Sequence, residues 1–159
     1  MPNDIYKSPQ SELEPIAYVD HYGNKLFEIQ SVGIATFCGS LLAGGVVMAI
    51  NFKNMGRSDH ALTTIVCSLI ATAILFALVF FVLLDSEIPR FIIVVPQVLL
   101  TLFCAKTYQG KSIDKHKENG GKLYSRWLAF LIGVITIVVI LIVTFLALLG
   151  YSLAQGFLQ

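Results

Sequence analysis

Long uncharged stretches of apolar residues dominate this chain, and they fall into four blocks. Three of them, Ile29 to Ile50, Ala61 to Leu84 and Trp127 to Gly150, hold 22 to 24 residues each and contain no charged side chain. A helix of 22 residues spans about 33 Å, enough to cross a hydrocarbon core of about 30 Å. The pattern therefore predicts membrane-spanning helices and an all-α fold, a transmembrane four-helix bundle.

The remaining block, the third in the chain, is shorter. It runs from Phe91 to Ala105, has 15 residues, and contains Pro96 and Gln97. Extending it to Ile88 through Tyr108 gives 21 residues, or about 31 Å of helix. A fourth span is therefore favoured, and three spans with a re-entrant helix in the third block form the alternative.

Basic residues outside the blocks concentrate between Lys106 and Arg126. If all four blocks span, the two sides hold eight and three Lys and Arg residues, and the positive-inside rule puts both termini outside. If the third block is re-entrant, the counts are nine and two, and the N-terminus lies inside. Both arrangements place the loop 106–126 in the cytoplasm and the C-terminus outside, but they disagree about the tail.

Composition supports a membrane protein, because 56% of the residues are hydrophobic and only 13% are charged, against about 25% charged in soluble domains. Residues 1–28 are polar and predict a largely disordered tail, and residues 29–159 predict a single transmembrane domain with a basic loop at 106–126. Within that loop, Ser112 to Asn119 is expected to form a short helix that Gly120 and Gly121 end.

Small residues form a stripe along the first block. Stripes of this kind allow two membrane helices to approach closely. We expect the first helix to pack along this stripe against the hydroxyl-bearing face of the second helix, which carries Thr64, Ser68 and Thr72; a homodimer face is the alternative. The stripe consists of Ala35, Gly39 and Ala43, with Gly44 on the adjacent ridge.

Two kinds of polar side chain are candidates for binding. Gln97 and Thr101 lie one turn apart in the third block, where polar groups usually face the bundle interior. They either form interhelical hydrogen bonds or line a path. Five cations near the membrane surface either set the topology or attract anionic lipid headgroups, at about 1 kcal/mol each. These cations are Lys111, Lys115, Lys117, Lys122 and Arg126.

Catalytic and metal-binding motifs are missing from the sequence, which lacks a P-loop, a nucleophile elbow and a dinucleotide fingerprint. His60 and His116 do not have the spacing of a metal site. We therefore expect no enzyme activity, cofactor, metal or nucleic-acid partner. The expected partners are the lipid bilayer and either further copies of the chain or another membrane protein. The predicted role is structural or accessory, and the alternative is an oligomeric transporter or channel component with a polar path near Gln97 and Thr101.

The opening Asp4 to Pro9 resembles the N-x-Y-x-x-P opening of many small bacterial membrane proteins. Two further pieces are the run Ala35 to Gly45 followed by Asn51 to Gly56, and the stretch from Gln109 through Gly120, Gly121 and Ser125 to Trp127. They resemble the first helix and the basic loop of an uncharacterised family of small bacterial four-helix inner-membrane proteins. The family often has a proline after its glycine pair, where this chain has Ser40 and Leu41. The resemblance implies a bacterial cytoplasmic membrane and hence a periplasmic C-terminus. It implies no known activity or site residues.

Overall fold

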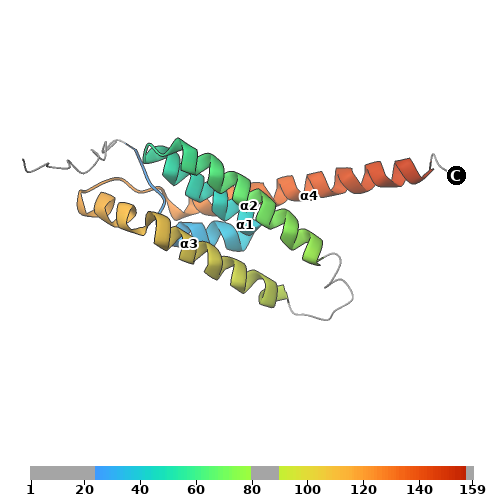
Figure 1. The fold of residues 1–159 in the computed structure, drawn as a ribbon, viewed down its shortest axis with the longest axis horizontal. Coiled ribbons are helices and arrows are strands. Elements are labelled where there is room, and N and C mark those ends of the chain that lie inside the picture. The colour runs from blue at the N-terminus through green and yellow to red at the C-terminus, as the bar shows by residue number, and fades with distance from the viewer. Residues whose placement is uncertain (1–23, 80–89, 157–159) are drawn as a thin grey trace, which may run out of the picture.

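The computed structural model describes residues 24–79 and 90–156, which form four helices (Figure 1). All four, with α1 counted as a single helix of 26 residues, have the length and hydrophobicity needed to cross a membrane. The prediction of an all-α fold with four helices is confirmed. The third apolar block lies in one continuous helix of 29 residues despite Pro96, so it is long enough to span. The helices are α1 (Ile29–Asn54), α2 (Ser58–Leu78), α3 (Arg90–Glu118) and α4 (Arg126–Gly156).

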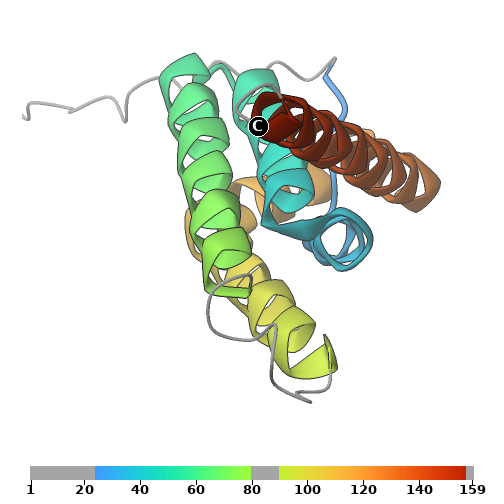
Figure 2. The same cartoon turned by 90° about the vertical axis from the view of Figure 1, so that its right-hand side faces the viewer.

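α1 reverses its direction at Ser40, whose φ of 78° and ψ of −179° lie outside the helical region. The second arm runs back toward the end where the first began (Figures 1 and 2). Asn24 Nδ2 donates to the Asn54 carbonyl at 3.2 Å, and Asn54 Nδ2 donates to the Lys25 carbonyl at 2.8 Å. The arms, of about 11 and 14 residues, are roughly 17 and 21 Å long, too short to cross a core of about 30 Å singly. α1 is therefore not the straight helix that the sequence predicts over Ile29 to Ile50, but two short arms that fold back on each other.

The reversal brings both ends of α1 to one end of the molecule, which we call the basal end. There the segment before α1 pairs with the segment before α4. Leu26 N donates to the Lys122 carbonyl at 3.2 Å, and Tyr124 N donates to the Leu26 carbonyl at 2.8 Å. The chain therefore enters α1 on the same side as its most basic segment. The four-span arrangement expected these two segments on opposite sides of the bundle, whereas the structure joins them at one end.

Two predicted boundaries also change. Residues 1–23 of the predicted tail lie outside the described residues, but Leu26 and Phe27 are only 3% and 1% exposed, so residues 24–28 are packed rather than disordered. α3 continues to Glu118, so more than half of the predicted loop 106–126 is helix. Gly120 has a φ of 73°, and the amides of Gly120 and Gly121 close a Schellman motif on the last turn. The predicted glycine end of this helix is confirmed.

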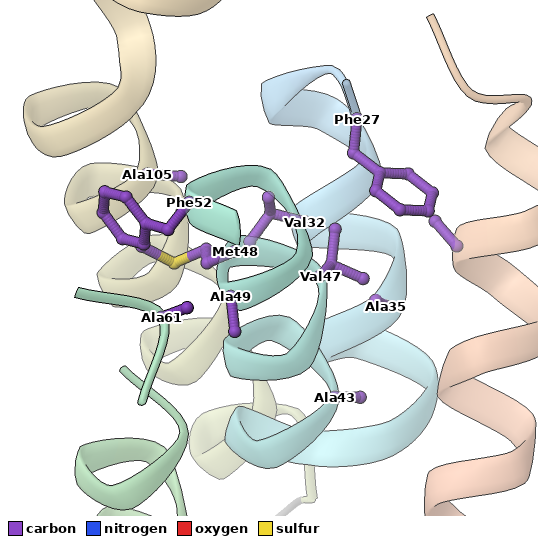
Figure 3. Packing of buried hydrophobic residues seen from close by; sticks show 11 residues of the cluster. Phe27, Val32, Ala35, Ala43, Val47, Met48, Ala49, Phe52, Ala61 and Ala105 are labelled. Carbon is purple, nitrogen blue, oxygen red and sulfur yellow. The ribbon is translucent and has the colours of Figure 1, made fainter. Parts of the chain in front are cut away.

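α1 is the centre of the bundle. Among the described residues, α2, α3 and α4 each pack on α1 and not on one another. Figure 3 shows Val32 and Val47 in the space between the two arms, and both side chains are fully buried. α2 and α3 run side by side, whereas α4 points away from them and extends well beyond the other helices (Figures 1 and 2). A short folded-back core therefore holds three longer helices.

The small-residue stripe is used inside the chain, where it joins α1 to more than one neighbour. A Cβ added at Gly39 would lie 2.8 Å from Gly133 Cα, so this part of the stripe meets α4. A Cβ at Gly45 would overlap the Ser68 side chain, so α2 approaches one residue beyond the stripe. The contact between α1 and the hydroxyl face of α2 exists, but Gly39 does not form it. All four stripe residues are buried: Ala35, Gly39, Ala43 and Gly44.

Candidate functional site: a groove between α2 and α3

α2 and α3 stand apart over the second arm of α1 and leave a cavity of about 390 Å³ between them, which we call the α2–α3 groove. Met48 and Phe52 of α1 form its floor. Lining residues recur along α2 at spacings of three and four from His60 to Ala71, so one helical face forms that wall. The volume lies within the usual range for pockets that hold small organic ligands, about 300–1,000 Å³.

The serine and threonine hydroxyls on the groove walls are hydrogen-bonded to carbonyls of their own helices. Thr64 Oγ1 donates to the His60 carbonyl at 2.7 Å, and Ser68 Oγ donates to the Ile65 carbonyl at 2.9 Å. On the opposite wall, Thr101 Oγ1 donates to carbonyls of its own preceding turn. Because these hydrogens are engaged, the hydroxyls have no proton to donate to a ligand. The walls therefore favour hydrocarbon over a strongly polar molecule.

Polar and basic residues surround the basal mouth of the groove. His60 and Tyr108 line this end, and the His60 ring lies 5.7 Å from the Phe52 ring. Lys53 is exposed in the last turn of α1, next to the groove floor. On α3, Lys111 is exposed one turn beyond Tyr108 and continues the groove-lining face of that helix. We call this end, with the lysines in the turns that adjoin it, the cationic mouth; the described residues that line the groove itself include no lysine, arginine or carboxylate.

A buried amide cluster holds the floor of the groove in place. Asn51 Oδ1 accepts from Phe27 N at 2.7 Å, and Asn51 Nδ2 donates to the Phe27 carbonyl at 2.9 Å and to Gln109 Oε1 at 3.0 Å. Gln109 Nε2 in turn donates to the carbonyl of Met48 at 2.8 Å. Both amide side chains are fully buried. This cluster, the amide clamp, ties the entry segment, the second arm of α1 and α3 together.

Sequence reasoning missed the amide clamp, although a signal for it was present. The buried residues Ala105, Gln109, Ile113 and His116 recur at spacings of three and four, which is the period of one helix face. That period continues through the first half of the predicted loop 106–126. Followed past the end of the apolar block, it marks Gln109 as an inward-facing amide in need of a partner.

An ion-pair cluster on the basal surface links three elements. Lys117 Nζ donates to Glu28 Oε1, and Arg126 donates to Glu28 Oε2 at 3.0 Å. These hydrogen bonds, the one from Lys117 above all, hold the pKa of the Glu28 carboxyl below its ordinary value of 4.5. The carboxylate therefore joins the start of α1 to the end of α3 and the start of α4.

The five predicted headgroup cations differ in their positions and partners in the structure. Lys117 and Arg126 pair with Glu28, and Lys115 and Lys122 are exposed on the same basal surface. Lys111 is exposed one turn beyond the groove-lining Tyr108. Its position on that face of α3 makes Lys111 the one of the five that best suits an anion at the groove.

The two predicted intramembrane polar residues, Gln97 and Thr101, have different surroundings in the structure. Gln97 is half-buried, and its amide donates to the Ile93 carbonyl of its own helix at 3.1 Å. Thr101 is buried and lines the α2–α3 groove, but Gln97 does not. The pair therefore does not line one shared cavity.

Metal-ligating side chains do not gather in groups of three or more anywhere in residues 24–79 and 90–156. His116 is engaged at the end of α3, where its Nε2 lies 3.1 Å from the Lys122 carbonyl, whereas His60 stacks near Phe52. Comparisons with protein-family models, curated proteins and solved structures find no match. The features that point to a function are therefore the groove, its cationic mouth and the amide clamp beneath it.

Proposed function

We propose that this protein is an accessory protein of the bacterial cytoplasmic membrane that binds a hydrophobic molecule of the bilayer in the α2–α3 groove. The groove carries this proposal: it is mainly apolar, its serine and threonine hydroxyls are bonded to their own helices, and it lies between two helices that pack on α1 rather than on each other. A ligand reaches such a site from the plane of the membrane rather than from water. Among the described residues that line it, none is a carboxylate, lysine or arginine, which favours binding over acid–base catalysis.

Charge supports an orientation with the basal end in the cytoplasm. The positive-inside rule assigns the side richer in Lys and Arg to the cytoplasm. With α1 re-entrant and the other helices spanning, the C-terminus lies in the periplasm. Nine of the chain's eleven Lys and Arg residues belong to the basal end or its adjoining helical turns: Lys25, Lys53, Arg57, Lys106, Lys111, Lys115, Lys117, Lys122 and Arg126.

Cysteine labelling tests this arrangement. In a chain without its native cysteines, single cysteines are placed at Lys25, Asn119 and Gln155, all exposed positions, and intact cells are treated with a membrane-impermeant maleimide. We expect labelling at position 155 only, and labelling at positions 25 and 119 only after the membrane is opened. If positions 25 and 119 react from opposite sides, α1 crosses the membrane and the proposed arrangement fails.

A groove-filling substitution tests the binding role. Ala71 lines the groove and Ala73 lies exposed on the outer face of the same helix, so Ala71→Trp and Ala73→Trp form a matched pair. Native mass spectrometry of the purified full-length protein reports lipids that survive mild delipidation. We expect retained lipid in the wild type and in Ala73→Trp, and at least a tenfold loss in Ala71→Trp. Equal retention in the two variants would refute binding in the groove.

The rival proposal, an oligomeric transporter or channel component, has less support. It requires Gln97 and Thr101 to present free polar groups along a common path. Instead, both side chains bond to carbonyls of α3 itself, and only Thr101 reaches the groove. Association with other membrane proteins fits the exposed outer half of α4, and membership of the bacterial family that the sequence resembles stays a prediction.

A further inference from the structure

The α2–α3 groove has the length and direction of one leaflet of a bilayer. It begins at His60 and Tyr108 at the basal end and extends to Ala71 and Leu100. Those separations correspond to about 12 to 17 Å along the two helices, close to half of a hydrocarbon core of about 30 Å. A single acyl chain of a basal-leaflet lipid covers the same depth.

The cationic mouth stands where such a chain joins its headgroup. His60 lines it, and Lys53, Lys106 and Lys111 are exposed in the turns of α1 and α3 that adjoin it. Two carboxylates in the same region, Asp59 and Asp114, offset part of this charge. The three lysines outnumber the two carboxylates, so a phosphate with no compensating positive group in its headgroup suits this end better than a zwitterion.

We propose that the groove holds one acyl chain of an anionic phospholipid from the basal leaflet, with its phosphate at the mouth beside Lys53 and Lys111. This inference rests on the proposed binding function and specifies its ligand. The apolar interior selects the chain, and the cations select the headgroup. Each cation near an anionic headgroup contributes about fivefold in affinity.

Photolabelling in nanodiscs tests the inference. The full-length protein is reconstituted with phosphatidylglycerol that carries a diazirine in one acyl chain, or with phosphatidylcholine that carries the same chain. We expect cross-links on groove-lining residues and a several-fold preference for phosphatidylglycerol. The double variant Lys53→Gln, Lys111→Gln removes about fivefold of that preference per cation and should therefore bring the two lipids close to equal labelling. Lys122→Gln, on the turn after α3, leaves the preference unchanged.

The outcomes distinguish recognition of the headgroup from binding of the acyl chain in the groove. Equal labelling by the two lipids would overturn the anionic headgroup while leaving hydrocarbon binding in the groove intact. If Ala71→Trp does not reduce the labelling, both the anionic headgroup and hydrocarbon binding in the groove would be overturned. If excess inorganic phosphate abolishes the preference, the mouth recognises free phosphate rather than a lipid.

A second measurement does not depend on a groove-filling variant. Cys104 lines the groove and is half-buried. In a chain that retains Cys104 as its only cysteine, phosphatidylglycerol nanodiscs should slow its reaction with a small maleimide several-fold relative to phosphatidylcholine nanodiscs. Equal rates in the two bilayers would contradict the proposed occupant.

Discussion

Replacing Asn51 by leucine should lower the free energy of unfolding more than any other substitution of similar size at the basal end of the protein. The substitution keeps the side-chain volume roughly constant but removes the amide. Phe27 loses both an acceptor for its N–H and a donor to its carbonyl, and Gln109 Oε1 loses its donor. All three groups belong to residues that are at most 1% exposed, so water does not replace the lost partners.

The expected cost follows from those three orphaned groups. A buried polar group without a partner costs about 1–3 kcal/mol, which gives an upper range of about 3–9 kcal/mol. Hydrogen bonds in membrane proteins are worth less, on average about 0.6 kcal/mol, because the unfolded chain in the membrane also finds partners. The new leucine gains little, since lipid is as apolar as leucine. We therefore expect a loss of about 3 kcal/mol, the low end of the range.

Unfolding in mixed micelles by increasing fractions of SDS, followed by circular dichroism, measures this loss. Asn54→Leu is the matched control: it lies in the same arm, and its amide makes one exposed bond, to the Lys25 carbonyl, so it should cost about 1 kcal/mol or less. Adding Gln109→Leu to Asn51→Leu removes one orphan, so the double variant should be about 1 kcal/mol more stable than additivity predicts. Equal costs for Asn51→Leu and Asn54→Leu, or strict additivity, would refute the reasoning.

Three further changes test the packing and the ion pairs. Gly133→Ala should destabilise the protein by about 1–3 kcal/mol, because the new Cβ would lie 2.8 Å from a side-chain carbon of α1; Gly150→Ala, with nothing within 4 Å, should be neutral or stabilising in the same SDS titration. Ser40→Gly should stabilise the fold by about 1 kcal/mol, because glycine tolerates its positive φ; Ser40→Ala should not. Glu28 has a lowered pKa, so its ion pairs contribute stability above pH 4.5 that is lost as the pH falls further. Thermal unfolding of Glu28→Gln should depend less on pH in that acidic window, and an unchanged slope would contradict the role of this carboxylate.

Sequence patterns predicted the membrane class and the helices, because apolar length and composition control whether a segment enters a bilayer. They did not show that Ile29 to Ile50 turns back on itself. A hydropathy window averages over Gly39 and Ser40, which are neither charged nor strongly polar, so a straight helix and a reversed one look the same. Counting charges did not help either, because each arrangement considered gave a strongly basic side.

The candidate site depends on contacts between residues that lie far apart in the sequence. Cys104 and Cys67 share a groove, and Asn51 meets Gln109, although 58 residues separate the two amides. Only the helical period of α3, extended past the apolar block, pointed toward this contact.

By itself the sequence determined that the chain is an α-helical membrane protein with a strongly basic side, since hydrophobicity and charge act locally along each segment. The tertiary structure decided that the first helix folds back on itself and forms the core of the bundle. One residue with a positive φ reverses its direction, and the buried amides of the clamp hold the returning arm. Because that short core separates α2 from α3, the groove between them is a property of the packed chain rather than of any single segment.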